Sequence, residues 1–156
     1  MTHAPNLPSR LLIVLLLLVT LGVPAAHAKQ GDTFGDNDLR GDYGFAFDGV
    51  LFLEGQPVPI AASGQFEADG KGTFPNFVRY VNVGGGLVLR QEGFGSYSVN
   101  PDGTGSAEFT VMTVEPPDAF PDTTETFTFT LAGNRRKVQF ISTTPGSVAM
   151  GLAIKQ

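Results

Sequence analysis

Residues 93–109 read GFGSYSVNPDGTGSAEF, two alternating stretches that meet at the sequence Asn-Pro-Asp-Gly. Asn100 is typical of the first position of a type I turn, and Pro101 presets φ near about −65° at the second. Gly103 supplies the left-handed residue through which strand pairing resumes with a bulge. The stretch therefore predicts a β-hairpin whose turn geometry is set by its residues.

On both sides of this hairpin, from residue 41 onward, stretches with a period of two alternate with Gly, Pro, Asn and Asp. No stretch keeps a helical period over three turns, so the pattern predicts strands throughout. Short links predict that strands adjacent in sequence pair, and closure of such a meander removes exposed edges. We therefore expect an all-β fold, a single eight-stranded antiparallel up-and-down β-barrel. The expected strands are 42–52, 60–68, 72–83, 87–99, 104–114, 124–132, 137–143 and 148–155.

Alternation also predicts which side chains face the interior. In residues 126–131, TFTFTL, Thr alternates with Phe127, Phe129 and Leu131, which we expect to point inward. In the last strand the larger set, Val148, Met150, Leu152 and Ile154, is expected to be buried in preference to 149, 151 and 153. The aromatic residues expected to face inward, and to line any ligand site, are Tyr43, Phe45, Phe47, Phe66, Tyr97, Phe109, Phe127, Phe129 and Phe140.

The N-terminus has the pattern of a secretory signal peptide. One positive charge precedes an apolar run over residues 11–23, and Ala26-His27-Ala28 follows Pro24, so we expect cleavage after Ala28. The alternative is a retained anchor, but a run of about a dozen residues is short of the roughly 20 that span a bilayer. We expect a signal peptide at 1–28, a flexible lead-in at 29–38 and the barrel domain at 39–156. The protein is thus expected to be secreted or periplasmic, with no stable membrane anchor after cleavage.

The composition of the mature chain excludes several chemistries. Removing residues 1–28 takes away one of ten basic residues and both histidines, which leaves nine basic and fifteen acidic residues with no His, Cys or Trp. A catalytic triad, a Cys nucleophile and a His or Cys zinc site are therefore excluded. We expect no metal and no cofactor. The acidic balance without a clustered basic face argues against a nucleic-acid partner. The oligomeric state is left open.

Three features are candidate sites. Inward Phe and Tyr rings are expected either to line a pocket for a small apolar molecule or to form a closed, dry core. Arg79, Arg90 and Glu92, on the strands that flank Gly84 to Gly86, are the candidates for catalysis as an inward charged cluster; the alternative is an exposed ion pair. In the longest connection, residues 115–123, Phe120 is expected either to cap a barrel mouth or to pack on its rim.

Three segments together resemble a known family: LRGDYGFAF at 39–47, GSYSVNPDGTG at 95–105 and VQFISTTPGS at 138–147. The chain resembles bacterial secreted proteins of the allene oxide cyclase barrel-like type, which are related in shape to the calycins. The resemblance implies the barrel fold. Members of this barrel class include plant cyclases of fatty-acid epoxides and bacterial cyclases of polyketides.

Three functions are expected in this order. The first is a secreted or periplasmic barrel that binds a small hydrophobic molecule in its Phe- and Tyr-lined interior. The alternative is a cofactor-independent cyclase or isomerase of the allene oxide cyclase-like type, which would enclose and fold an apolar substrate. The third is a structural or interaction barrel with a filled core.

Overall fold

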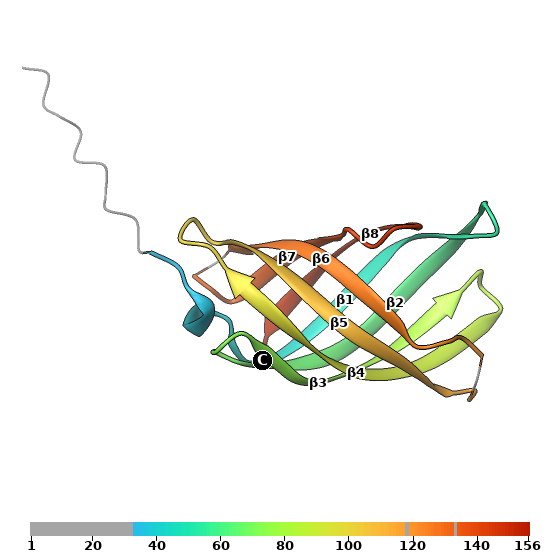
Figure 1. Cartoon of the computed structure of the whole chain (residues 1–156), viewed down its shortest axis with the longest axis horizontal. Helices are drawn as coiled ribbons and strands as arrows, with labels where there is room; N and C mark the ends of the chain where they lie inside the picture. Colours follow the sequence, from blue (N-terminus) through green and yellow to red (C-terminus); the bar gives the residue numbers. More distant parts are fainter. Residues whose placement is uncertain (1–32, 118, 133) are drawn as a thin grey trace, which may run out of the picture. The chain divides into compact units, whose positions relative to one another are not determined.

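The chain folds into an eight-stranded antiparallel barrel in which each strand pairs with its neighbours in sequence and β8 closes onto β1 (Figure 1). The computed structural model describes residues 33–117, 119–132 and 134–156. The expected signal peptide and the first part of the lead-in lie outside the described residues. A 3₁₀ turn, η1 (Asp36–Asp38), precedes the strands. The strands are β1 (Arg40–Leu53), β2 (Gln56–Asp69), β3 (Thr73–Val83), β4 (Leu87–Val99), β5 (Thr104–Glu115), β6 (Thr123–Ala132), β7 (Lys137–Ser142) and β8 (Ser147–Lys155).

The hairpin at the centre of the sequence has the expected turn. The Gly103 amide donates to the Asn100 carbonyl at 2.9 Å, and Gly103 has φ +85°. The strand bounds agree closely with expectation except in β2, which begins at Gln56 rather than residue 60. Glu54 and Gly55 both have positive φ and form a two-residue turn, so pairing resumes at once despite Pro57 and Pro59. These prolines pair with β1, and β3 joins β2 only from Ile60 onward.

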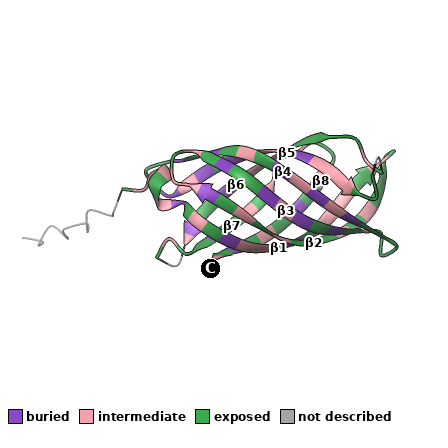
Figure 2. Ribbon diagram, turned by 90° about the horizontal axis from the view of Figure 1, so that it is seen from below, coloured by how far each residue is buried: buried purple, intermediate pink, exposed green. Residues whose placement is uncertain are grey.

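Buried and exposed positions alternate along the strands, as an interior and an exterior face require (Figure 2). In β8 the expectation was wrong, because the large side chains face outward: Val148 is 67% and Met150 64% exposed. Ala149 and Ala153 are buried instead. Side chains of the neighbouring strands already fill the space on this side. A Cβ on Gly151 would meet the ring of Phe140 in β7 and, in β1, the Cβ of Phe47 and the carbonyl oxygen of Ala46. At Gly151, the inner face of β8 therefore has no room for a side chain.

One end of the barrel is closed by the segment that precedes β1. Leu39 is almost fully buried, and Phe34 packs against the adjoining core. Asp36 accepts a hydrogen bond from the Val99 amide through Oδ1 at 2.7 Å, and the Tyr97 hydroxyl donates to the Leu39 carbonyl at 2.6 Å. Residues 34–38, expected in a flexible lead-in, thus pack on this end, which we call the plugged end. The end of β8 lies beside it (Figure 1).

Two hydrophobic clusters stack along the barrel axis. The cluster nearer the plugged end contains Tyr43, Phe74, Tyr97 and Phe129, and the cluster nearer the other end, the mouth, contains Val81, Leu89 and Ala149. Within the part of the chain that the structure describes, no helix has the length and apolar character needed to cross a bilayer. No cluster of three or more metal-ligating side chains occurs among these residues.

Candidate functional site

The half of the barrel near the plugged end is packed with aromatic rings. Phe74 and Phe109 stack with ring centroids 4.6 Å apart, and Phe66 meets Phe74 edge to face at 5.1 Å. The rings lie over inward glycines, because a Cβ on Gly105 would collide with the ring of Phe129. The cavity left between them is about 60 Å³. Small-molecule sites measure roughly 300–1,000 Å³, so this space is too small for an organic ligand without movement of the rings.

The mouth half contains a larger pocket of about 460 Å³. This volume lies within the roughly 300–1,000 Å³ of small-molecule sites. We call it the mouth pocket. Its walls are the side chains of Leu51, Ile60, Val81, Val83, Leu89 and Ala149; Phe120 and Pro121 of the β5–β6 connection lie at its rim with hydroxyl residues of β6 to β8. Phe120 packs against the mouth cluster. The pocket is thus apolar on its walls and polar on one side of its rim.

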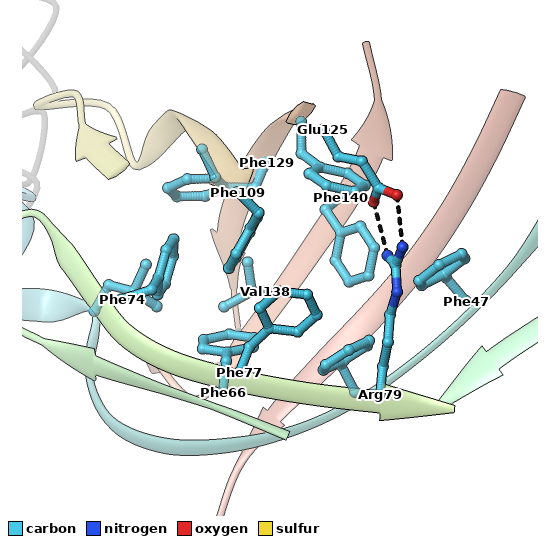
Figure 3. Close-up of a pocket in the computed structure, with 14 residues that line it drawn as sticks. Phe47, Phe66, Phe74, Phe77, Arg79, Phe109, Glu125, Phe129, Val138 and Phe140 are labelled. Atoms are coloured by element: carbon cyan, nitrogen blue, oxygen red, sulfur yellow. Dashed lines mark hydrogen bonds and ion pairs between the residues drawn. The ribbon is translucent and has the colours of Figure 1, made fainter. Parts of the chain in front are cut away.

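A charged pair lies where the mouth pocket meets the Phe-rich half, because both of its residues line the two spaces, and we call it the floor of the mouth pocket. Figure 3 shows the pair beside the rings that line the inner cavity. Arg79 of β3 reaches across the barrel to Glu125 of β6. Its Nη1 donates to Oε2 at 2.7 Å and its Nη2 to Oε1 at 2.5 Å. The side chains are 7% and 22% exposed. This bidentate arrangement is the strong form of an Arg–carboxylate contact.

Three further side chains contact the guanidinium group, and a fourth holds one of these three in place. Arg79 Nε donates to Gln91 Oε1 at 2.8 Å, and Gln91 Nε2 donates to Thr113 Oγ1 at 3.0 Å. Arg79 Cζ lies 5.6 Å from the ring centroid of Phe47 and 5.7 Å from that of Phe77, within the range of cation–π contacts. The polar network therefore runs over strands β3 to β6 and is set between aromatic rings. A charge this deeply buried needs such partners, because an unpaired one is costly.

The aromatic residues expected to line a ligand site fall into two groups. Phe47 and Phe127 line the mouth pocket as well as the small inner cavity. The residues that line the inner cavity and not the mouth pocket are Phe45, Phe66, Phe109, Phe129 and Phe140. Tyr43 and Tyr97 lie deeper, in the core at the plugged end. The structure therefore places most of the nine in packing, and the open volume lies nearer the mouth.

The three candidates for catalysis lie on two different faces of the barrel wall. Arg79 faces inward, whereas Arg90 and Glu92 lie on the outer face, where they form an ion pair along β4. Their side chains are partly exposed. Alternation explains the difference, since Gln91 lies between them and is the inward residue. An exposed pair of this kind contributes little to stability, because water and salt screen it.

Glu125 is the residue that the sequence reasoning missed, although the signal was present. Alternation places Phe127, Phe129 and Leu131 on the inner face, and one further step of two residues reaches Glu125. Gln91 lies on the face of Tyr97 and Val99 by the same rule. The pairing of Arg79 with Glu125 is harder to predict from the sequence, because it depends on the position of each residue along the barrel axis.

The two buried tyrosines, Tyr43 and Tyr97, belong to the core of the plugged end and have no part in the mouth pocket. The Tyr97 hydroxyl accepts from the Gly70 amide at 2.9 Å and donates to Leu39, so it ties the plug to the barrel. The Tyr43 hydroxyl is buried with no hydrogen bond of normal geometry to the described residues. Burial raises the pKa of both hydroxyls above the usual value, and backbone amides partly oppose the rise. Both therefore stay protonated at neutral pH.

Comparison with known proteins supports the fold. No protein-family model matches the chain, and no curated protein matches it. Among solved structures the chain is similar to a redesigned β-barrel, mFAP1, bound to DFHBI, with 16% sequence identity and a TM-score of 0.50. The similarity covers 77% of this chain and 97% of that barrel. At this identity the likeness concerns the barrel fold, and the allene oxide cyclase-like family remains a resemblance.

Proposed function

We propose that this barrel is a binding protein for a small, mostly apolar molecule, which it holds in the mouth pocket. The observation that carries the proposal is the combination of a 460 Å³ apolar pocket with one largely buried, hydrogen-bonded charged pair at its floor. Apolar walls provide affinity through burial, and a few placed polar groups provide orientation. A pure structural barrel has no need of a buried Arg–Glu pair, since hydrophobic residues of similar volume are often as stable.

Two further points support binding. An eight-stranded barrel is about the size that either fills with side chains or holds one small ligand. This chain has a filled half and an open half. The similar barrel mFAP1 is one that is bound to DFHBI, so the architecture is compatible with a guest molecule.

Titration with a neutral environment-sensitive dye, N-phenyl-1-naphthylamine, tests the proposal. Ala149 lines the pocket, so Ala149→Phe is expected to fill it and to weaken dye binding at least tenfold. Val148→Phe is the matched control. Val148 is the neighbour of Ala149 in the sequence, but its side chain points outward, so the substitution should leave dye binding unchanged. Saturable binding to the unmodified chain with this pattern supports the proposal. Absence of binding, or equal binding by both variants, contradicts it.

The enzyme alternative is favoured by one observation, the Glu125 carboxylate at the floor of an apolar cavity. A carboxylate in that position is suited to proton transfer in a cyclase or isomerase. The discriminating experiment incubates the chain with an unsaturated fatty-acid epoxide, the substrate class of the plant cyclases it resembles, and analyses the recovered molecule. An unchanged molecule supports simple binding. A rearranged product that disappears with Glu125→Gln supports the enzyme.

We also propose that the barrel acts outside the cytoplasm as a protein that begins at Lys29. The N-terminal pattern and the cleavage motif at Ala26 to Ala28 support this. Intact-mass analysis of the protein recovered from the envelope or medium of its host tests it. A mass that starts at Lys29 is expected, and a membrane-bound chain that retains residues 1–28 contradicts it.

A further inference from the structure

We propose that the mouth pocket selects neutral molecules with one hydroxyl group on an apolar body, and that Arg79 and Glu125 recognise the hydroxyl together. The inference rests on the proposed function, because it names the ligand chemistry of the same pocket. It is drawn from the charge balance of the lining and from the hydrogen-bonding groups left open at the floor.

Charge balance favours a neutral ligand. Among the described residues that line the mouth pocket, Arg79 and Glu125 are the charged ones, and their charges cancel. A carboxylate ligand would place a second negative charge beside Glu125, and an ammonium ligand would place a second positive charge beside Arg79. Such repulsion is stronger in a partly buried pocket than in bulk water. The floor therefore differs from an anion site, in which an arginine has no acidic partner.

The hydrogen-bonding capacity of the floor fits a hydroxyl group. A guanidinium has five N–H donors, and Arg79 uses three of them, one on each nitrogen, within the described structure. One N–H on Nη1 and one on Nη2 remain. Each oxygen of Glu125 accepts one hydrogen bond from Arg79 and has further lone-pair capacity. A hydroxyl group both donates and accepts, so it can donate to Glu125 and accept from Arg79 at once.

The floor groups are fixed before a ligand arrives. Phe47 and Phe77 flank the guanidinium, and Gln91 holds its Nε, so Arg79 has little freedom to turn toward a different partner. Glu125 is held at both oxygens. This rigidity reduces the ordering cost of binding and opposes displacement of Glu125 by a ligand carboxylate.

Three probes on one aromatic skeleton test the inference: 2-naphthol, 2-methylnaphthalene and 2-naphthoate. Their affinities at pH 7 for the full chain, expressed with its own N-terminal segment, are measured by displacement of N-phenyl-1-naphthylamine. We expect 2-naphthol to bind about tenfold more tightly than each of the others, as one hydrogen bond to a charged group would give. Apolar burial is common to all three, so the difference reports the floor alone.

Glu125→Gln provides the sharper test, because it removes the negative charge and keeps the shape. The floor then carries a net positive charge from Arg79, so we expect the order to reverse and 2-naphthoate to become the tightest probe. Glu92→Gln is the matched control, since Glu92 pairs with Arg90 on the outer face. This control should keep the order of the unmodified chain. Circular dichroism establishes that each variant is folded.

The outcomes separate this inference from the proposed function. Preference for 2-naphthol, reversed by Glu125→Gln alone, supports the inference. Equal binding of the three probes, or tightest binding of 2-naphthoate to the unmodified chain, overturns it and leaves the proposed function standing. Failure of all probes and of the dye to bind overturns the proposed function itself. If Glu125→Gln does not fold, the order measured on the unmodified chain decides.

Discussion

Arg79 and Glu125 depend on one another, because Arg79 is buried, Glu125 is partly buried, and each has the other as its charged partner. Loss of one partner leaves an isolated charge in an apolar interior, whereas loss of both leaves a hydrophobic contact. Replacing both residues together should therefore change the free energy of unfolding little, whereas replacing only one should lower it strongly. Its value lies in the ligand contacts that it prepares.

A double-mutant cycle tests this dependence. Arg79→Met and Glu125→Leu should each lower the free energy of unfolding by about 2–4 kcal/mol, with allowance for the partial exposure of Glu125. The combined variant should lose much less than the sum of the two. Urea unfolding measures all four chains. Additive losses would contradict the account, because they would mean that the two side chains act independently.

The two buried tyrosines give a matched pair at the same end of the barrel. Tyr97→Phe should lower the free energy of unfolding by about 1–3 kcal/mol, because it leaves the Gly70 amide and the Leu39 carbonyl without their partner. Tyr43→Phe removes a hydroxyl with no partner of normal geometry and should be neutral or stabilising. Thermal unfolding of both variants checks the order. Equal losses would contradict the assigned roles.

The raised pKa of these hydroxyls gives a pH dependence with a definite sign. Unfolded tyrosine ionises near pH 10, whereas the folded chain keeps these protons to higher pH. Above about pH 10 the folded state thus binds more protons, and stability falls as pH rises. The double variant Tyr43→Phe with Tyr97→Phe should show a shallower fall than the unmodified chain. An unchanged slope would contradict it.

At the scale of elements, β8 shows that volume, rather than hydrophobicity, decides the inner face. Its large residues point outward, and its inner face carries only small ones. At Gly151 the reason is direct, because the ring of Phe140 and the Cβ of Phe47 occupy the space that a side chain would need. Exposed apolar side chains are common on protein surfaces and need no pocket. The inner face of a strand is thus complementary to its neighbours.

Substitutions on the two faces of β8 should therefore differ. Ala153 is fully buried, and Ala153→Leu should lower the free energy of unfolding by about 1–3 kcal/mol through overpacking. Met150→Ala, on the outer face, should change it by less than about 0.5 kcal/mol. Denaturant midpoints measure both. A larger effect of Met150→Ala would indicate that the outer face is packed against something in solution.

The β4–β5 hairpin and β8 together show what the sequence can predict. The hairpin turn and seven strand starts within two residues follow from local rules, because turn residues and alternation act over a few positions. The inner face of β8 does not follow, since it depends on rings that arrive from other strands. Alternation extended from Phe127 predicts that Glu125 faces inward. The contact of Glu125 with Arg79 needs the stagger of the whole barrel, which no local pattern contains.

At the scale of the whole molecule, the barrel has one plugged end and one mouth, and the two have separate tasks. The Asp36 carboxylate joins the plug to the amide of Val99, and neither residue lines the mouth pocket. The plug closes the core, and the mouth holds the open volume. Stability and ligand binding should therefore respond to different substitutions.

Asp36→Ala tests this separation. It should lower the free energy of unfolding by about 1–2 kcal/mol, because the Val99 amide loses its acceptor, and leave dye affinity unchanged. Asp48→Ala, on the exposed outer face of β1, is the control and should alter neither. Urea unfolding and dye titration are measured on the same samples. A large fall in affinity with Asp36→Ala would contradict the separation of the two ends.

The central claim is that a small molecule binds in the mouth pocket above the Arg79–Glu125 floor. The most direct measurement is nuclear magnetic resonance of the ¹⁵N-labelled chain during titration with 2-naphthol. The account predicts shifts of the Arg79 Nε–H signal and of amides near Leu89, Ala149 and Phe120, with amides near Asp36 and Tyr97 unmoved. Shifts confined to the outer face of β8 or to the plugged end would contradict it.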